Sequence, residues 1–318
     1  MNILFMGTPD FAQESLKVLC ENNYNILGVV TKIDTPKGRG MKLAKSEVKI
    51  YAEEKGLKIF QPEKVKNNTE FINEIKSLNP DLIVVVAYGK ILPKDILDIP
   101  KYGCVNVHAS LLPKYRGAAP IQWSVLNGDK VTGITTMYMD IGMDTGDIIM
   151  QEELEIGENE TTGELWDRLK VLGGKLLLKT VQEIENNDGK VERIKQGDDF
   201  TIAPMLNKEM AVIDFNKTAN EIHNLVRGLN PIMGAITYLD EKKIKIWKTE
   251  VVKEDLEIEN IEEKENGEVV ISDQKKGLFI KTNNGIIKVL EIQGDNGKRL
   301  NIGDFLRGNN IEVGKIFK

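Results

Sequence analysis

The feature that most restricts the fold is an unbroken apolar run, Leu-Ile-Val-Val-Val, at residues 82–86. A strand built from this run has no polar face, so it must be covered on both sides. Such burial is typical of a central strand in a parallel sheet that carries helices on each face. Strand-like and helix-like segments alternate before and after the run. The first half of the chain is therefore predicted to be a doubly wound, Rossmann-like α/β domain.

The periodicity of apolar residues predicts the order of elements in this domain. We expect strands at 2–6, 26–31, 81–87, 105–107, 132–139 and 148–156, and helices after Pro9, at 118–126 and after Thr161. The turn after the first strand contains Gly7 but lacks the pattern Gly-x-Gly-x-x-Gly that cradles a pyrophosphate. We therefore expect no nicotinamide cofactor.

The character of the sequence changes after residue 188. Residues 189–206 are irregular and include Pro204, so we predict a linker there. Beyond it, a helix beginning at Thr218 is followed by short strand-like runs at 235–239, 243–249, 268–272, 277–282 and 285–293. Short strands with one helix resemble a small β-barrel of the OB type. We predict a catalytic domain at 1–188 and a smaller OB-like domain at 207–318.

Composition excludes several classes of protein. The chain of 318 residues has two cysteines, Cys20 and Cys104, and two histidines, too few for a disulfide framework or a zinc site. No apolar stretch is long enough to cross a bilayer, and the N-terminus lacks the cationic start of a signal peptide. We expect a cytoplasmic monomer without metal and without a membrane partner. The net charge of −6 does not indicate nucleic acid, although a local basic patch could still bind it.

Two polar side chains stand out where the fourth expected strand ends. Val105 and Val107 alternate with Asn106 and His108, so the amide and the imidazole are expected on one face of the strand. A loop containing Pro113 follows. The pair is thereby predicted at the carboxyl end of a sheet strand, where ligands bind in open α/β sheets.

A carboxylate completes the candidate site. Asp144 lies between Gly142 and Gly146 in a turn that joins two expected strands. An amide, an imidazole and a carboxylate suit attack by an amine on a carbonyl, because the first two can stabilise an oxyanion and the third can accept a proton. No serine or cysteine nucleophile accompanies His108, so we expect direct transfer without a covalent enzyme intermediate. The other histidine, His223, is interpreted as a surface or half-buried helix residue.

A basic segment lies between the second strand and the helix near Ser46. Residues 32–49 carry six basic side chains against Asp34 and Glu47. Pro36 and two nearby glycines are predicted to prevent regular structure there. A segment of this kind can contact phosphates. From the residues alone, an exposed and solvated loop is the favoured interpretation.

Two motifs resemble the signatures of the folate-dependent formyltransferases. The first is Asn106-Val-His108 with Ser110-Leu-Leu-Pro113 and Arg116-Gly-Ala-Ala-Pro120, and the second runs from Thr136 to Gly146. Gly7-Thr-Pro-Asp-Phe11, the segment Pro36-Lys-Gly-Arg-Gly40 and the β-rich C-terminal part resemble one branch of that superfamily. In this branch the amine acceptor is the methionine carried by initiator tRNA.

The resemblance implies transfer of a formyl group from 10-formyltetrahydrofolate to the α-amine of initiator methionyl-tRNA. It implies that the catalytic residues are Asn106, His108 and Asp144. The residues it implies for the folate site are Ser110, Leu111, Leu112 and Pro113. It also reverses the interpretation of the basic segment, whose implied tRNA contacts are Lys37, Arg39, Lys42 and Lys45.

Two alternatives stay open at this point. The same chemistry could serve an amino sugar nucleotide or another small amine, although the basic segment and the C-terminal domain argue against such an acceptor. The chain could also be a non-catalytic RNA-binding protein. Against that stands the intact set of Asn106, His108 and Asp144.

Overall fold

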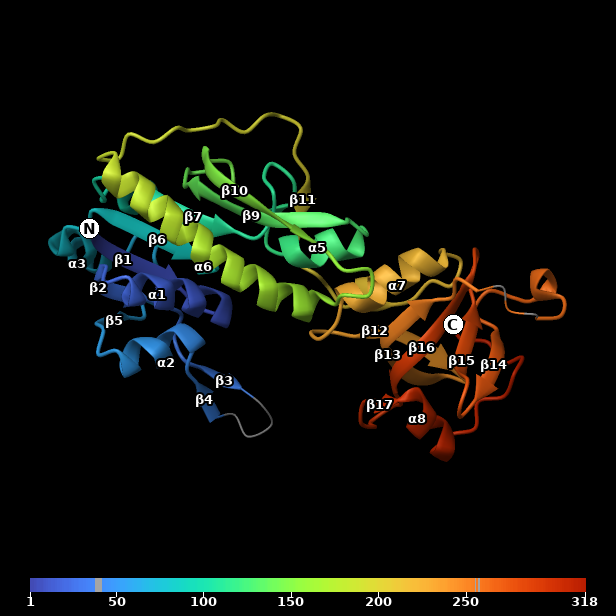
Figure 1. The fold of residues 1–318 in the computed structure, drawn as a ribbon. Coiled ribbons are helices and arrows are strands. Elements are labelled where there is room, and N and C mark those ends of the chain that lie inside the picture. Colours follow the sequence, from blue (N-terminus) through green and yellow to red (C-terminus); the bar gives the residue numbers. More distant parts are fainter. Residues whose placement is uncertain (38–41, 255, 257) are drawn as a thin grey trace. The chain divides into compact units, whose positions relative to one another are not determined.

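The computed structural model describes residues 1–37, 42–254, 256 and 258–318 (Figure 1). This part of the chain forms two compact units. The first comprises residues 1–120, 131–155 and 166–204, and the second comprises residues 121–130, 156–165 and 205–318. The predicted domain boundaries at residues 188 and 206 stay predictions.

A seven-stranded sheet lies at the centre of the first unit (Figure 1). In order across the sheet, its strands are β10 (Ile148–Glu155), β9 (Val131–Tyr138), β7 (Cys104–His108), β6 (Leu82–Val86), β1 (Asn2–Gly7), β2 (Asn25–Val30) and β5 (Ile59–Phe60). The five strands from β7 to β5 are parallel, and β9 and β10 extend the sheet as antiparallel strands. The predicted Rossmann-like sheet is confirmed, and the apolar run forms the fully buried β6.

Helices cover both faces of this sheet, as a doubly wound fold requires. On one face, α1 (Asp10–Glu21) lies beside α6 (Thr162–Asn186), where Phe11 and Trp166 meet edge to face at 5.3 Å between ring centroids. On the other face, α3 (Thr69–Leu78) buries Ile75 in one cluster with Ile83 and Val85 of β6. The remaining helices of this unit are α2 (Glu47–Glu54) and α4 (Lys94–Leu97).

The second unit is built on an antiparallel sheet that pairs in the order β12-β13-β16-β15-β14, with β17 added beside β16. Its elements are α5 (Pro120–Leu126), α7 (Ala219–Gly228), β12 (Ala235–Leu239), β13 (Lys242–Val251), β14 (Val269–Asp273), β15 (Gly277–Lys281), β16 (Ile286–Gln293), β17 (Leu300–Asn301) and α8 (Ile302–Gly308). Short 3-10 helices occur at Glu209–Ala211 and Ile261–Glu263. The predicted strand-rich C-terminal domain is confirmed, whereas β17 and α8 were not expected from the sequence.

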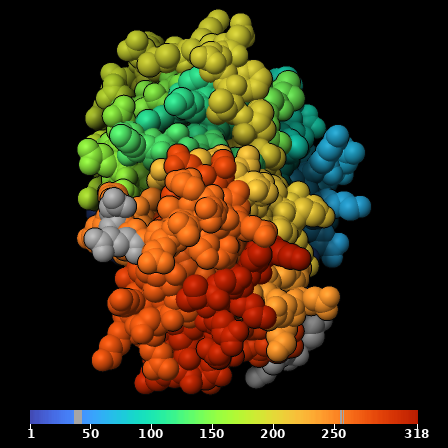
Figure 2. All heavy atoms as spheres, turned by 90° about the vertical axis from the view of Figure 1, so that its right-hand side faces the viewer, coloured from blue at the N-terminus to red at the C-terminus, as the bar shows by residue number. Residues whose placement is uncertain are grey.

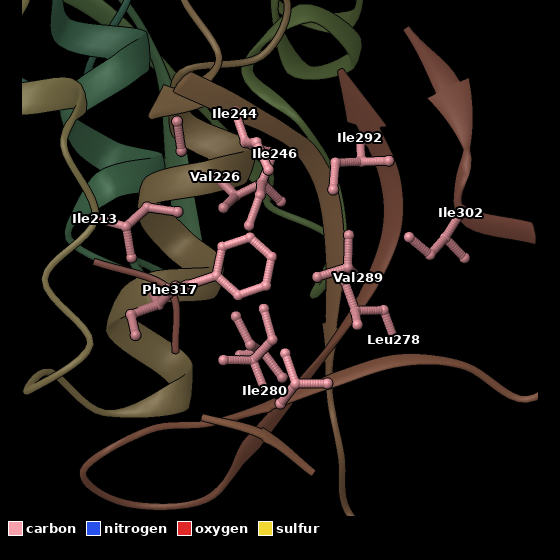
Figure 3. Packing of buried hydrophobic residues seen from close by; sticks show 14 of the residues in the cluster. Ile213, Val226, Ile244, Ile246, Leu278, Ile280, Val289, Ile292, Ile302 and Phe317 are labelled. Atoms are coloured by element: carbon pink, nitrogen blue, oxygen red, sulfur yellow. The ribbon is translucent and has the colours of Figure 1, made fainter. Parts of the chain in front are cut away.

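One apolar cluster holds the second unit together. Phe317, which is 1% exposed, lies among Ile246, Ile280 and Val226 from two strands and α7 (Figure 3). Helix α7 begins with a capping box: the Thr218 hydroxyl accepts a hydrogen bond from the Glu221 backbone N–H, and the Thr218 backbone N–H donates to the Glu221 carboxylate. One face of the second unit, with residues late in the chain coloured orange to red, is seen in the space-filling view (Figure 2).

The basic segment differs from its prediction of irregular structure. β3 (Thr35–Lys37) and β4 (Lys42–Ala44) form a two-stranded antiparallel hairpin in which Lys37 pairs with Lys42. Pro36 is compatible with this ribbon, because proline is tolerated in a strand whose outer edge has no partner. Another strand pair that the sequence did not predict joins β8 (Arg116–Gly117) to β11 (Ile202–Ala203) in parallel.

Candidate active site

The end of β7 holds His108 in a buried position. The alternation predicted for this strand is present: Val107 faces α6, where a Cβ on Gly173 would lie 3.3 Å from it. His108 therefore projects from the opposite face, as does Asn106. The His108 ring is 6% exposed, and its Nε2 lies 2.9 Å from the carbonyl oxygen of Tyr115. Because a carbonyl only accepts, this contact requires a proton on Nε2, which leaves Nδ1 as the ring nitrogen that faces Asp144.

The turn between β9 and β10 brings Asp144 to this histidine. Asp144 adopts a left-handed backbone with φ 53°, a conformation that aspartate tolerates better than most residues. Its Oδ2 accepts a hydrogen bond of 2.8 Å from the backbone N–H of Gly117. Its Oδ1 lies 3.7 Å from His108 Nδ1, an ion-pair distance that is longer than a direct hydrogen bond. Catalytic contacts of this length commonly shorten once a substrate is bound.

Asn106 lies two residues before His108 on the same face of β7. It is partly exposed and stands opposite Met137 of β9, while His108 stands opposite Thr135. The antiparallel pairing of β7 with β9 thus connects the strand that carries Asn106 and His108 to the turn that carries Asp144. The structure brings the predicted trio to one region of the sheet.

The loop at residues 110–113 is fixed by internal hydrogen bonds around Thr135. Thr135 Oγ1 donates to the carbonyl of Ser110 at 2.6 Å and accepts from the N–H of Leu112 at 3.0 Å. Ser110 is fully buried and Leu112 is 3% exposed, whereas Leu111 and Pro113 are partly exposed. The two buried residues therefore determine the shape of the loop, and only the other two offer side-chain surface to a ligand. The predicted folate contacts stay a prediction.

A cavity of about 590 Å³ lies beside the other end of β7. Its lining includes Cys104, the exposed Ile141 and the guanidinium-bearing Arg193, and it reaches the turn that leads to Asp144. Burial raises the pKa of Cys104 to about 12, so its thiol is neutral near pH 7 and is a poor nucleophile. This volume falls in the usual range for small-molecule sites.

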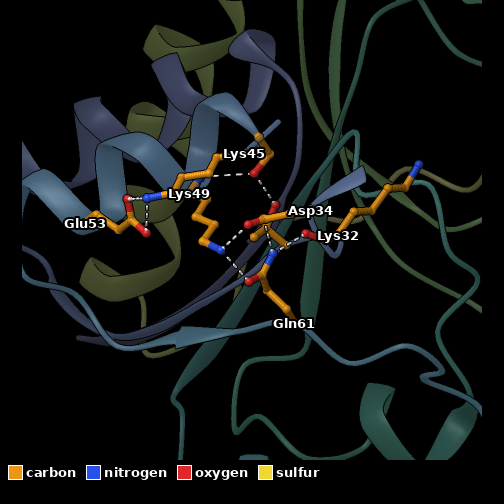
Figure 4. Close-up of polar contacts among 8 residues, drawn as sticks. Lys32, Asp34, Lys45, Lys49, Glu53 and Gln61 are labelled. Atoms are coloured by element: carbon orange, nitrogen blue, oxygen red, sulfur yellow. Dashed lines mark hydrogen bonds and ion pairs between the residues drawn. The ribbon is translucent and has the colours of Figure 1, made fainter. Parts of the chain in front are cut away.

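The basic segment is partly neutralised by neighbouring carboxylates (Figure 4). Lys45 Nζ bonds both oxygens of Glu53 at 3.0 and 2.7 Å, which raises the pKa of Lys45. Lys49 Nζ bonds Asp34 at 2.7 Å, and this bond lowers the pKa of Asp34. Lys45 is thus paired with a carboxylate of its own chain, and its predicted contact with tRNA stays a prediction.

Among the other predicted tRNA contacts, Lys37 and Lys42 form the closing pair of the β3–β4 hairpin. Arg39 lies outside the described residues. Sequence reasoning missed Gln196, which bonds the Asp144 turn from within the predicted linker. No local pattern marks this glutamine, because its partners are distant in the sequence.

His223 is buried at 5% exposure rather than lying at the surface. Its ring nitrogens lie 3.0 Å from Thr249 Oγ1 and 3.2 Å from the carbonyl of Glu158. Burial is the main cause that lowers the pKa of His223. The prediction of a surface or half-buried position was wrong, because both nitrogens find partners inside the second unit.

Two further observations concern the described ranges only. Within them, no three residues of the types His, Cys, Asp and Glu are grouped so that they could hold a metal ion. No helix in the same ranges has the length and apolar character needed to cross a membrane.

Models of two protein families match the chain. The formyl transferase model matches residues 1–181, and the model of the formyl transferase C-terminal domain matches residues 205–310. Among solved structures, an N-formyltransferase from Helicobacter canadensis in complex with folinic acid and dTDP-3-aminofucose is similar, with a TM-score of 0.64 at 23% identity over 90% of this chain and 98% of that chain. HypX from Aquifex aeolicus in complex with tetrahydrofolic acid has a TM-score of 0.64 at 14% identity, over 99% of this chain and 50% of that chain. At these identities the likeness shows the fold alone.

Relatives with much higher identity specify the family further. The methionyl-tRNA formyltransferase of Clostridium perfringens (strain 13 / Type A) is 50% identical over 319 residues, covering 100% of both chains. That of Ruminiclostridium cellulolyticum is 48% identical over 316 residues, covering 99% of both. With the formyl transferase models matching both parts of the chain, this protein belongs to the methionyl-tRNA formyltransferase family.

Proposed function

We propose that the chain transfers the formyl group of 10-formyltetrahydrofolate to the α-amino group of methionine on initiator tRNA, in the cytoplasm, for translation initiation. The observation that carries the proposal is the pairing of His108 with Asp144 at the end of β7. It supplies the acid–base chemistry that amine attack on a formyl carbon needs. Full-length relatives at 48% and 50% identity support the acceptor.

The residues divide the work according to their contacts. Asp144 can accept the proton of the attacking amine, directly or through one water, because its Oδ1 is not occupied by a hydrogen bond to the backbone. That proton then passes to the donor nitrogen as the bond between this nitrogen and the formyl carbon breaks, so that tetrahydrofolate leaves. His108, with its Nε2 proton committed to Tyr115, offers Nδ1 toward the reacting group. Protonated at Nδ1, His108 can donate to a developing oxyanion, and the Asn106 amide can donate beside it. Loss of one such donor typically costs about 10²–10³ in rate.

The folate, when bound, supplies an activated formyl group. The proposed place for it is the cavity beside Cys104, which lies at the end of β7 opposite to His108, has the size of a small-molecule site and reaches the turn that carries Asp144. Ile141 leaves apolar surface exposed at this cavity, on the same turn as Asp144. We assign this surface to one face of the donor, and we assign the partly exposed Leu111 and Pro113, in the loop after the opposite end of β7, to a second contact with it.

The basic hairpin is the proposed tRNA contact. Lys37 and Lys42 close the described part of the ribbon, and Arg39 lies between them in sequence. Lys45, already bonded to Glu53, is the weakest of the four proposed contacts. Phosphate contacts make binding salt-dependent, so replacing Lys42 by glutamine should lessen the dependence of tRNA KM on salt.

The test is a formyl-transfer assay with purified protein, radiolabelled donor and three acceptors. These are charged initiator tRNA, charged elongator tRNA and an amino sugar nucleotide. The proposal expects formylation of the initiator tRNA with a kcat/KM at least about tenfold above that of the other two. Preferential formylation of the sugar nucleotide would replace the proposed acceptor. Tight tRNA binding without transfer to any acceptor would support a non-catalytic RNA-binding protein.

Ile141→Ser tests the donor site without disturbing the core, because Ile141 is 69% exposed. Its loss should raise the donor KM about three- to tenfold, in line with the apolar area that a bound ligand would cover. The tRNA KM should stay unchanged. A normal donor KM would remove the cavity from the proposal and leave the acceptor assignment intact.

A further inference from the structure

The segment that follows α6 looks like an exposed connector but is attached to the candidate site at several points. It returns over β10 to β11 in an extended path (Figure 1). Ile194 exchanges two backbone hydrogen bonds with Ile148 of β10, at 2.8 and 2.9 Å. Thr201 then bonds the loop after β7, accepting from Tyr115 N through its Oγ1 and from Arg116 N through its carbonyl. A segment whose backbone is bonded in this way is part of the scaffold rather than a free linker.

Between these attachment points, Gln196 uses its whole side-chain amide. Its Nε2 donates to the carbonyl of Asp144 at 2.9 Å and to the carbonyl of Gly146 at 2.7 Å. Its Oε1 accepts from Nε of Arg116 at 2.9 Å. The opposite amide orientation would place Oε1 against two carbonyl oxygens, so the hydrogen bonds define which end carries the nitrogen.

These contacts form a closed ring through the predicted catalytic carboxylate. Gln196 donates to the backbone carbonyl of Asp144, and Asp144 Oδ2 accepts a hydrogen bond from Gly117 N. Arg116, the residue before Gly117, donates to Gln196 and closes the ring. The guanidinium of Arg116 is buried at 8% exposure and stacks on Phe200 at 4.5 Å from the ring centroid. The ring therefore fixes both the backbone and the side chain of Asp144.

We infer that Gln196 is a positioning residue that holds the Asp144 turn against the loop at Arg116, so that the carboxylate stays in reach of His108. This inference rests on the proposed function for its kinetic consequence. Asp144 has a left-handed backbone and meets His108 Nδ1 at 3.7 Å, so a small shift of the turn changes the one contact that the chemistry uses. A displacement of about 1 Å in a catalytic group can cost about 10²-fold in rate.

Two replacements of matched size separate the roles of the amide. Gln196→Met keeps the length of the side chain and removes its hydrogen bonds to Asp144, Gly146 and Arg116. Gln196→Glu keeps an acceptor for Arg116 but turns carboxylate oxygens toward the carbonyls of Asp144 and Gly146. The control is Asp199→Asn, a change of the same segment at an exposed position.

We expect Gln196→Met to lower kcat about 10- to 100-fold while the KM values for donor and tRNA change less than about threefold. Gln196→Glu should be impaired at least as much, although it retains the Arg116 contact. Asp199→Asn should behave as the unmodified protein. In an Asp144→Asn background, Gln196→Met should lower kcat little further, because the carboxylate that Gln196 positions is already removed. The inference would be overturned if kcat in the double variant fell by the product of the two single decreases, or if Gln196→Met had a normal kcat.

Hydrogen exchange of the Gly117 amide provides a readout that does not depend on activity. This N–H donates to Asp144 Oδ2, so it should exchange faster in Gln196→Met and at the normal rate in Asp199→Asn. If the unmodified protein transfers no formyl group, the proposed function fails and the exchange rate alone decides the positioning role. An unchanged Gly117 rate in Gln196→Met would then overturn it.

Discussion

Replacing Asp144 by asparagine separates the chemistry of this residue from its structural contact. The hydrogen bond from Gly117 N to Asp144 Oδ2 is 2.8 Å long, and an amide oxygen can accept it in the same geometry, although more weakly than a carboxylate. The size of the side chain is unchanged. What the substitution removes is the negative charge facing His108 and the ability to take a proton at neutral pH.

The size of the expected effect follows from these contacts. Loss of a general base costs about 10²–10⁴ in rate, which corresponds to about 2.7–5.4 kcal/mol in activation free energy. Asp144→Ala loses the same function and, in addition, leaves Gly117 N without its acceptor. A hydrogen bond to a charged group contributes about 1.5–3 kcal/mol, so Asp144→Ala should lower the free energy of unfolding by about that amount. Asp144→Asn should lower it by less than half as much.

Single-turnover formylation of charged initiator tRNA at saturating donor measures the first quantity, and urea denaturation measures the second. We expect the two variants to be similarly slow but to differ clearly in stability. If Asp144→Asn transfers formyl groups within about threefold of the unmodified rate, Asp144 is not the base and the reasoning is refuted. Equal destabilisation by both variants would instead refute the role given to the Gly117 contact.

Three further results are expected elsewhere in the chain. Because Glu53 bonds Lys45, Lys45→Ala should raise the KM for tRNA less than about twofold. Glu53→Gln should lower the KM for tRNA, because it releases Lys45. Steady-state kinetics at fixed salt that show the opposite changes would contradict this expectation. Burial lowers the pKa of His223, so below about pH 6.5 the unfolded chain binds a proton that the folded chain does not. The free energy of unfolding should therefore fall with decreasing pH below about 6.5, and urea titrations of His223→Gln should show a shallower fall. Gly234 has φ 67°, and a Cβ there would lie 3.0 Å from three atoms of the Trp247 ring, so Gly234→Ala should cost about 1–3 kcal/mol; an unshifted urea midpoint would count against it.

Local periodicity accounts for the part of the fold that the sequence predicted correctly. The run at 82–86 has no polar position, and it became the strand that is buried on both faces. The alternation of Val107 with Asn106 and His108 predicted which residues share a face, because a strand has a period of two. These features depend on neighbouring residues alone, so they can be deduced without knowing the tertiary contacts.

The features that the sequence did not reveal depend on contacts that local periodicity does not record. Proline and glycine predicted irregular structure in the basic segment, yet β3 and β4 pair there, with Lys37 opposite Lys42. Lys45 bonds Glu53, which lies near the end of α2, and no periodicity in the segment before the helix predicts that contact. Gln196 joined residues that lie 50 to 80 positions away, and neither composition nor spacing records such a contact.

The extended path from α6 to β11 also bears on how the chain can be re-engineered. By exposure alone, residues around 192–199 resemble a favourable place to insert a domain, to attach a reporter or to open new termini by circular permutation. The bonds at Ile194, Gln196 and Thr201 mean that extra residues there would pull on the turn that carries Asp144. Fusion partners are better placed elsewhere, since tolerance depends on what the backbone is bonded to and not on how much of it meets solvent.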